Sequence, residues 1–466
     1  MEIKELYEIY KAHPVVTTDS RNCPEGSMFF ALKGETFDGN KFALQALEKG
    51  CAYAVVDNSS LLTPHSSLIF VDNVLETLQT LARYHREQLN IPVVGITGTN
   101  GKTTTKELVA TVLSKKYRVH YTQGNFNNHI GVPLTLLSIK PDCEIAVIEM
   151  GANHPGEIRT LANIALPTCG LITNVGKAHL EGFGSLEGVI NTKKELYDNL
   201  AERGGHVFVN ASNPLLMKVL HNAQPTVLSL GEKCTMHNAQ LTTYSSNLDV
   251  AAEVKGRLLR CAPYVEFEWE SQLSTFNFQL STHFVGAYNL DNMLAAITVG
   301  LHFGVAEEDI CAALSEYVPA NNRSQLTKTE RNTLIVDAYN ANPTSMMAAI
   351  DNFELMEGEN KVAILGDMLE LGEQSALEHQ NIVRRLIDSK IEKVILVGKE
   401  FCKCTMHNAQ PAVLSFGEKR TIDARFVVYE SLDALLETQC IASLQSQLIL
   451  LKGSNGVGLY KLVPYL

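Results

Sequence analysis

Apolar residues form short runs separated by polar or helical stretches in the first part of the chain. These runs are Met28–Leu32, Ala52–Val56 and Leu68–Val71. A helix-like segment, 74–89, then leads to Pro92, where the pattern changes. The pattern predicts a small N-terminal α/β domain over residues 1–88.

From Ile91 onward, buried strands alternate with helices, as in a parallel sheet with crossover helices. Residues 91–96 are predicted as a strand. Residues 103–115 are predicted as a helix, because apolar side chains recur there at i, i+4 spacing. Further strands are predicted at 145–148, 170–172 and 206–209. The Thr- and Ser-rich stretch 225–285 has short alternating runs and would add β-structure to the same domain. We therefore predict a central domain over residues 89–317.

The same alternation resumes after Val318-Pro319, with strands predicted at 333–336, 362–365 and 394–397. These strands predict a C-terminal domain over residues 318–466. With 466 residues the chain is too long for one hydrophobic core, and about three domains are expected. The predicted fold class is α/β with three domains. A central P-loop-type parallel-sheet ATPase domain is flanked by the small N-terminal α/β domain and a Rossmann-like C-terminal one.

Composition narrows the class of protein. Apolar residues make up 45% and charged residues 19%, as in an ordinary globular protein. The net charge of −12 argues against a nucleic-acid binder but leaves room for a local basic pocket.

No apolar run approaches the ~20 residues that a bilayer requires, and the N-terminus lacks signal-peptide features. The ten cysteines include no C-x-x-C pair. We expect free thiols, no zinc site, no membrane insertion and a cytoplasmic location.

One sequence segment occurs twice. Residues 233–240 recur identically at 403–410, and 221–233 recur with two changes at 407–419. Two widely separated copies do not make a solenoid. A duplicated loop-and-strand segment and an artefact of how the chain was made both fit, and we assign the repeat no function.

A glycine-rich segment, Gly95–Thr105, lies between the first strand and the first helix of the central domain. A strand, such a turn and a helix place backbone N–H groups and the positive helix end against phosphate oxygens. Lys102 would then reach the terminal phosphates, and the Thr103 hydroxyl would suit Mg²⁺. The strict P-loop pattern is not met, because Ile96 stands where its first glycine would be. The alternative is a glycine turn with a surface lysine.

Three further polar groups are candidates for chemistry. Glu149 ends a predicted strand, so its carboxylate would project toward the phosphate loop and could bind Mg²⁺. His179 lies in a turn-rich segment, and Lys193 precedes Lys194 on a predicted helix. Each also has an ordinary structural explanation. A carboxylate can end a strand in solvent, a lone histidine is often a packing residue, and paired lysines usually face water.

Taken together, the motifs resemble the Mur ligases of peptidoglycan synthesis. The resemblance covers nearly the whole chain and is closest to the members that add D-alanyl-D-alanine to a UDP-N-acetylmuramoyl-tripeptide. The Asp-Asn-Pro-Arg motif, typical of the sister ligase that adds the third amino acid, is absent here. The motifs that carry the resemblance are Asp19–Arg21, Phe29–Glu35, Asp38-Gly39, Gly98–Thr104, Gly124–Asn128, Gly131–Leu134, Glu149, His179–Ser185, Thr192–Leu196, Asp337–Pro343, Leu365–Gly372 with His379, and Lys452–Ser454.

The resemblance implies a role for each matching residue. Nucleotide contacts are expected from Gly98, Thr99, Asn100, Gly101, Lys102, Thr103, Thr104, Asn289, Asn292, Arg323 and Asp337. Mg²⁺ ligands are expected at Thr103, Glu149, His179 and Lys193, with Lys193 converted to a carbamate by CO₂. Lys102, Glu149, His179 and Lys193 would be catalytic. Substrate contacts are expected from Ser20, Arg21, Asn125, Asn127, Asn128, Tyr339, Asn340 and Asn342. The chain departs from the family pattern at Tyr288, Asn322 and Asn455, where histidine, glycine and arginine are usual.

The implied activity is ATP-dependent amide formation through an acyl phosphate. It would be the last cytoplasmic step toward UDP-N-acetylmuramoyl-pentapeptide, and so would serve cell-wall biogenesis, cell shape and cell division. The expected partners are ATP, Mg²⁺, the UDP-tripeptide and D-alanyl-D-alanine. The protein itself is expected to be a monomer. The alternatives are a related ligase such as a folylpolyglutamate-type enzyme, a P-loop NTPase acting as a switch, and an inactive scaffold. The third residue of the peptide, diaminopimelate or lysine, stays open.

Overall fold

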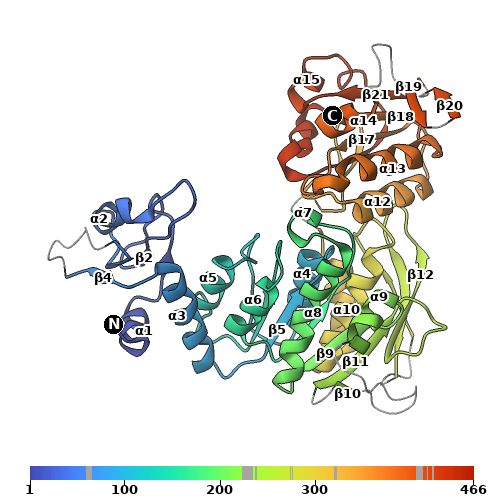
Figure 1. Cartoon of the computed structure of the whole chain (residues 1–466). Coiled ribbons are helices and arrows are strands. Elements are labelled where there is room, and N and C mark those ends of the chain that lie inside the picture. The colour runs from blue at the N-terminus through green and yellow to red at the C-terminus, as the bar shows by residue number, and fades with distance from the viewer. Residues whose placement is uncertain are drawn as a thin grey trace.

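The computed structural model describes residues 1–58, 66–222, 235–236, 239–272, 274, 277–319, 323–405, 413–416, 418–421 and 424–466. Within these residues the chain forms three α/β units that follow one another in sequence (Figure 1). This confirms the predicted fold class, while the boundaries at 88/89 and 317/318 stay a prediction. The repeated segments lie largely outside the described residues. None of the described helices is long and apolar enough to cross a membrane.

The N-terminal unit is a four-stranded parallel sheet in the order β1-β2-β3-β4. Successive residues of β2 face opposite sides: Phe30 packs with α1 and α3, and Phe29 packs with α2. Because both faces are covered, its strands are continuous apolar runs, as predicted. The elements are α1 (Ile3–Ala12), β1 (Val16–Thr17), β2 (Met28–Phe30), α2 (Ala43–Glu48), β3 (Tyr53–Val56), β4 (Leu68–Phe70) and α3 (Val74–Gln88).

Buried polar contacts join this unit to the central one. The Arg86 guanidinium on α3 donates to the carbonyls of Ala165 and Leu166 at 3.0 and 3.2 Å. The Tyr10 hydroxyl donates to the Leu137 carbonyl at 2.6 Å. These contacts fix the N-terminal unit on the side of the central unit away from the C-terminal one (Figure 1).

The central sheet has the order β14-β13-β12-β11-β9-β8-β5-β7-β6, with β10 paired to β11. Strands β5 to β9 are parallel, and β12 to β14 are antiparallel. The Thr- and Ser-rich stretch therefore extends this sheet, as predicted. The strands are β5 (Val93–Thr97), β6 (Val119–Tyr121), β7 (Ile145–Glu149), β8 (Cys169–Ile172), β9 (His206–Asn210), β10 (Thr235–Met236), β11 (Ala239–Ser245), β12 (Val254–Arg260), β13 (Glu266–Ser271) and β14 (Phe278–Ser281).

Helices cover both faces of the central sheet. Apolar residues of α4, α10 and α11 share one core cluster with the strands, and residues of α6, α8 and α9 share another. The helices are α4 (Lys102–Leu113), α5 (Gly131–Leu137), α6 (Glu157–Ala165), α7 (Leu180–Phe183), α8 (Leu186–Glu202), α9 (Pro214–Asn222), α10 (Asn289–His302) and α11 (Glu307–Glu316).

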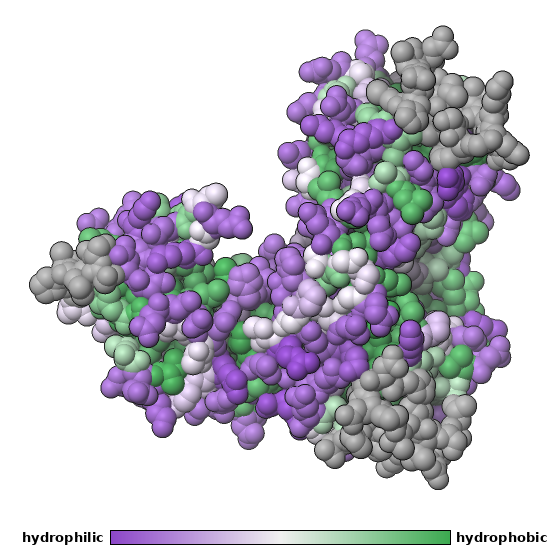
Figure 2. Space-filling view, viewed as in Figure 1, coloured by the Kyte–Doolittle hydropathy of each residue, from purple (hydrophilic) through white to green (hydrophobic). Residues whose placement is uncertain are grey.

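The C-terminal sheet has the order β15-β16-β22-β17-β18-β21, parallel except for β15. Strand β22 lies between β16 and β17, so the polar residues that end β16 and β22 lie side by side. The elements are β15 (Gln325–Lys328), β16 (Thr333–Asp337), α12 (Pro343–Leu355), β17 (Lys361–Gly366), α13 (Ser375–Ile387), β18 (Lys393–Val397), α14 (Lys399–Thr405), β19 (Val413–Phe416), β20 (Glu418–Thr421), β21 (Phe426–Tyr429), α15 (Leu432–Leu436) and β22 (Leu448–Lys452). Figure 2 shows an open gap between the N- and C-terminal units, above the central one.

Candidate active site

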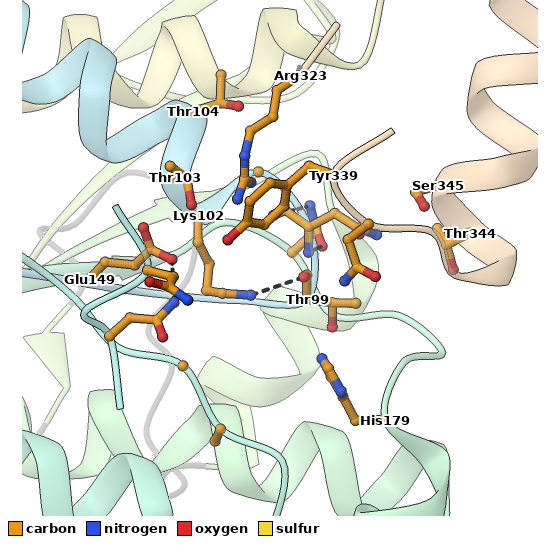
Figure 3. Close-up of a pocket in the computed structure, with 18 of the residues that line it drawn as sticks. Thr99, Lys102, Thr103, Thr104, Glu149, His179, Arg323, Tyr339, Thr344 and Ser345 are labelled. Atoms are coloured by element: carbon orange, nitrogen blue, oxygen red, sulfur yellow. Dashed lines mark hydrogen bonds between the residues drawn. The ribbon is translucent and has the colours of Figure 1, made fainter. Parts of the chain in front are cut away.

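A pocket of about 980 Å³ lies between the central and C-terminal units. The central unit contributes the phosphate loop, the end of β7, the loop after β8 and the start of α10. The C-terminal unit contributes polar side chains that include Arg323, Asp337, Tyr339, Glu370 and Lys452. Figure 3 shows that side chains from both units converge on this space.

The phosphate loop has a backbone that only glycine allows at two positions. Gly98 has φ +146°, and a Cβ there would lie 2.0 Å from the Thr173 hydroxyl oxygen. Gly101 has φ +78°, and a Cβ there would lie 2.5 Å from Asn292 Oδ1. Helix α4 begins directly afterwards, at Lys102, with its free N–H groups at the pocket. The predicted order of strand, glycine-rich turn and helix is thus present, and the helix starts one residue earlier than predicted.

The loop after β8 holds the phosphate loop in place. The Thr99 N–H donates to the Asn174 carbonyl, and the Asn100 N–H donates to Asn174 Oδ1, each at 2.9 Å. Lys102 Nζ donates to the Gly98 carbonyl at 2.8 Å and to the Thr99 carbonyl at 3.1 Å, and Figure 3 shows the bond to Thr99. Burial lowers the pKa of Lys102, although the nearby Glu149 carboxylate opposes this effect. The lysine therefore lies along the loop, at the place where a phosphate would compete for its ammonium group.

Glu149 is the last residue of β7, and only 1% of it is exposed. Its Oε1 accepts a hydrogen bond from Asn127 Nδ2 at 2.7 Å, whereas its buried Oε2 has no hydrogen-bond partner among the described residues. An unpaired buried carboxylate oxygen is costly unless a cation or donor reaches it. The donor set therefore fits a divalent cation. No cluster of three or more His, Cys, Asp or Glu suited to a metal occurs in the described part of the chain, so the remaining ligands would come from hydroxyl, substrate and water oxygens.

His179 lines the same pocket and makes contact across the domain interface. Its ring nitrogen lies against Glu370 of the C-terminal unit, and this contact lowers the pKa of the Glu370 carboxyl. Both residues have left-handed backbones, with φ of 49° and 64°. Such conformations are uncommon for residues other than glycine and often mark functional loops.

Lys193 does not line the pocket but is buried beside it on α8, with 2% exposure. Its Nζ lies 5.4 Å from the centre of the Phe183 ring. Burial lowers its pKa to about 7, and the positive charge of Lys102 contributes to this lowering. The next residue, Lys194, instead pairs with Asp198 one helical turn away. The two neighbouring lysines therefore differ in environment, and Lys193 is the one that can be a neutral amine near neutral pH.

The remaining predicted nucleotide contacts lie at the other side of the pocket. Asn292 accepts from the Thr105 hydroxyl and donates to Asn289, each at 3.0 Å. The Arg323 guanidinium stacks on the Tyr339 ring at 3.8 Å (Figure 3), and its buried Nε has no partner among the described residues. Asn289, Asn292 and Arg323 all line the pocket, and their predicted contacts with a nucleotide stay a prediction.

The predicted substrate residues are divided between the pocket and other parts of the molecule. Ser20 and Arg21 lie in the N-terminal unit, outside the pocket, where Arg21 pairs with Asp19 and its side chain is 88% exposed. Asn125, Asn127, Asn128, Tyr339 and Asn340 do line the pocket. Asn342 does not; it caps α12 and donates to Asn100 Oδ1 across the interface at 2.7 Å.

Sequence reasoning assigned no role to several pocket residues. Lys452 is 2% exposed and donates to Asp337 at 2.6 Å. Its signal in the sequence was a charged residue directly after the apolar run Leu448–Leu451. Thr344 and Ser345 lie at the start of α12, after a residue suited to capping. Glu370 lies within the Leu365–Gly372 motif.

A parallel-sheet domain with a phosphate loop, covered by a second α/β domain, defines a nucleotide-dependent enzyme that encloses its reactants between two domains. Comparison with known proteins narrows this class. The chain belongs to the Mur ligase family. The Mur ligase family catalytic domain matches residues 14–92, the Mur ligase middle domain matches 96–300, and the Mur ligase, glutamate ligase domain matches 322–455.

Individual relatives are similar over most of their length. The UDP-N-acetylmuramoyl-tripeptide–D-alanyl-D-alanine ligase of Bacillus subtilis (strain 168) is 37% identical over 96% of this chain and 92% of its own. The enzyme of the same name from Escherichia coli (strain K12) is 33% identical over 96% and 92%. The crystal structure of MurF from Acinetobacter baumannii superposes with a TM-score of 0.82 at 28% identity, covering 99% of this chain and 97% of that one.

Proposed function

We propose that this protein is an ATP-dependent ligase that joins D-alanyl-D-alanine to UDP-N-acetylmuramoyl-tripeptide and releases ADP and phosphate. The observation that carries the proposal is the interdomain pocket, which combines the phosphate loop with the unpaired Oε2 of Glu149. The relatives that are more than 30% identical over nearly their whole length support the choice of substrates.

The tripeptide carboxylate attacks the γ-phosphorus of ATP in line, ADP leaves, and an acyl phosphate forms. The α4 N-terminus and Lys102 offset the charge that develops on the transferred phosphoryl group. The amine of D-alanyl-D-alanine then attacks the acyl carbon, and phosphate leaves from the tetrahedral intermediate. The C-terminal unit covers the pocket, so water is kept from the acyl phosphate while Arg323 and Asp337 reach the nucleotide.

Thr103, Glu149 and His179 are the residues that would hold Mg²⁺. When bound, Mg²⁺ offsets negative charge on the phosphate oxygens. Asn127 orients the Glu149 carboxylate through Oε1, which leaves Oε2 free to face the pocket.

Lys193 is proposed to react with CO₂ and become a carbamate. A neutral amine is the reactive form, and a pKa of about 7 leaves roughly half of the side chain neutral at pH 7. The carbamate turns a cation into a carboxylate-like group beside the metal site. Lys193→Ala should abolish activity, and short carboxylic acids should restore part of it, whereas Lys194→Ala should retain activity. Full activity in Lys193→Ala would rule the carbamate role out.

We further propose that the protein acts as a cytoplasmic monomer. Ser20 and Arg21 are proposed to contact the UDP end of the substrate from the N-terminal unit. The gap between the N- and C-terminal units would then admit a long substrate that reaches the pocket with its peptide end (Figure 2).

A phosphate-release assay with ATP and the UDP-tripeptide tests the proposal. D-alanyl-D-alanine should trigger release, while D-alanine and L-alanine should not. Release with a single amino acid would favour a related ligase instead. ATP hydrolysis that needs no acceptor amine would favour a switch-type NTPase, and no release in any mixture would indicate an inactive scaffold.

A further inference from the structure

The segment 174–181, a loop that runs into the first residues of α7, lies between the phosphate loop and the C-terminal unit. On its inner side, Asn174 holds the backbone of Asn100, and the Gly176 N–H donates to the Thr99 hydroxyl at 3.0 Å. On its outer side it meets the C-terminal unit at several points. A Cβ on Gly176 would lie 2.9 Å from the Thr344 hydroxyl oxygen, and His179 contacts Glu370. The segment therefore contacts both the phosphate loop and the C-terminal unit, beside the direct contact that Asn342 makes with Asn100.

One ion pair of this segment joins the two units directly. Lys177 Nζ lies 2.7 Å from Glu378 Oε1 on α13, and these residues are 201 positions apart in sequence. The Glu378 side chain is 5% exposed, whereas that of Lys177 is 46% exposed. A surface ion pair contributes little because both ions stay hydrated. Here the carboxylate has lost its water, so the attraction to Lys177 matters more and the loss of that partner costs more.

The pair can form only while the two units are in contact. If the C-terminal unit moves away, Lys177 and Glu378 separate and both regain water. The pair therefore stabilises the covered form of the pocket selectively and has no effect within either unit alone. Neither side chain lines the pocket, so neither is placed to touch a bound nucleotide.

We propose that Lys177 and Glu378 form a closure latch, a positioning pair that holds the 174–181 segment, and with it His179, against the C-terminal unit while the reactants are enclosed. The role of the latch in turnover rests on the proposed function. When the latch is weakened, the pocket opens more often during the lifetime of the acyl phosphate. Water then attacks the acyl carbon, the acyl–oxygen bond breaks, and phosphate and the original carboxylate are released without peptide product.

The test uses charge reversal and charge exchange in the full-length protein. The variants are Lys177→Glu, Glu378→Lys and the double exchange. Lys115 and Glu316 supply a control for charge reversal within one unit, because their ion pair has a similar length of 2.9 Å and the same separation of 201 positions but lies within the central unit, with Glu316 exposed. Each variant is assayed for kcat/KM with D-alanyl-D-alanine and for the ratio of peptide product to phosphate released.

Each single reversal should lower kcat/KM at least about tenfold and bring the product-to-phosphate ratio below one. The double exchange should recover most of both losses, and reversal of Lys115 should change neither. Recovery by exchange separates a latch from a general folding defect, because a defect in either unit would persist in the double variant. Single reversals with wild-type kinetics, or a double exchange no better than the singles, would overturn the proposal.

A binding measurement tests the latch without requiring the ligase reaction to occur. Calorimetry with a non-hydrolysable ATP analogue reports closure, because both units line the nucleotide pocket. The single reversals should weaken binding and the exchange should restore it. If wild-type protein showed no release with D-alanyl-D-alanine but this binding pattern held, the proposed function would fail and the latch would stand. If release occurred normally but the binding pattern was absent, the latch alone would fail.

Discussion

Replacement of Lys193 by methionine should make the protein inactive and more stable at neutral pH. The side chain is 2% exposed, and burial lowers its pKa from 10.5 to about 7. At about 1.4 kcal/mol for each tenfold change, and with half of the side chain neutral at pH 7, this lowering costs the folded state about 4 kcal/mol at pH 7. Methionine has similar length and no charge, and its imperfect fit should cost less than about 1.5 kcal/mol. The net gain should therefore be about 3 to 4 kcal/mol.

The sign of the pH dependence follows from proton binding. Between pH 7 and 10.5 the unfolded chain holds a proton on Lys193 that the folded protein has lost. Wild-type stability should therefore rise with pH in that window, relative to Lys193→Met, by about 1.4 kcal/mol for each pH unit. The advantage of the variant should be greatest near pH 7 and should shrink steadily toward pH 10.

The chain offers a specific probe for this measurement. Trp269, its single tryptophan, is buried in β13 of the same sheet that α8 covers. Urea unfolding followed by Trp269 fluorescence therefore reports on the central unit. Buffers must be free of CO₂, because a carbamate would add stability to the wild type only. Lys194→Met, on the same helix, is the control and should change stability by no more than about 0.5 kcal/mol. No gain in Lys193→Met, or a gain that is constant from pH 7 to 10, would refute the reasoning.

Three shorter predictions address other parts of the pocket. Gly101→Ala should weaken ATP binding at least about tenfold, because its Cβ would lie 2.5 Å from Asn292 Oδ1; an unchanged KM for ATP would contradict this. Asp337→Asn should destabilise the C-terminal unit by about 3 kcal/mol, because it leaves the ammonium of Lys452 buried without its partner. Hydrogen exchange in β16 and β22 measures this loss, and unchanged protection there would count against it. Glu149→Gln should raise the Mg²⁺ concentration for half-maximal phosphate release at least about tenfold, and a Mg²⁺ titration that matches wild type would exclude Glu149 as a ligand.

Most of the buried parallel strands could be predicted because such strands are continuous apolar runs. The prediction missed the short strand β6, the edge strand β21 and the central strand β22. For example, the predicted 145–148 strand differs from β7 by one residue, and β7 ends on the pocket residue Glu149. The phosphate loop of the pocket could also be predicted, because such loops lie between a strand and a helix. Contacts between distant segments could not be predicted. Asn100 and Asn342 are 242 positions apart, and no local pattern relates them.

The burial of Lys193 did have a signal in the sequence that our reasoning missed. On α8, the buried residues Val189, Leu196 and Leu200 are spaced to form one apolar stripe. Lys193 lies four residues after the first and three before the second, so helical periodicity places it within that stripe, whereas Lys194 lies beside it. A lysine at an apolar position of an amphipathic helix is a sign of a lowered pKa.

The pocket contains backbone conformations that cost folding free energy. Six residues other than glycine have positive φ among those described, and three of them, His179, Ser324 and Glu370, line the pocket. Glycine would adopt these conformations without the ~1 kcal/mol penalty that other residues incur. It would, however, remove the imidazole and carboxylate that meet across the interface. The strain is therefore the cost of having a histidine and a glutamate face each other at a domain boundary, which is where a closing active site needs them.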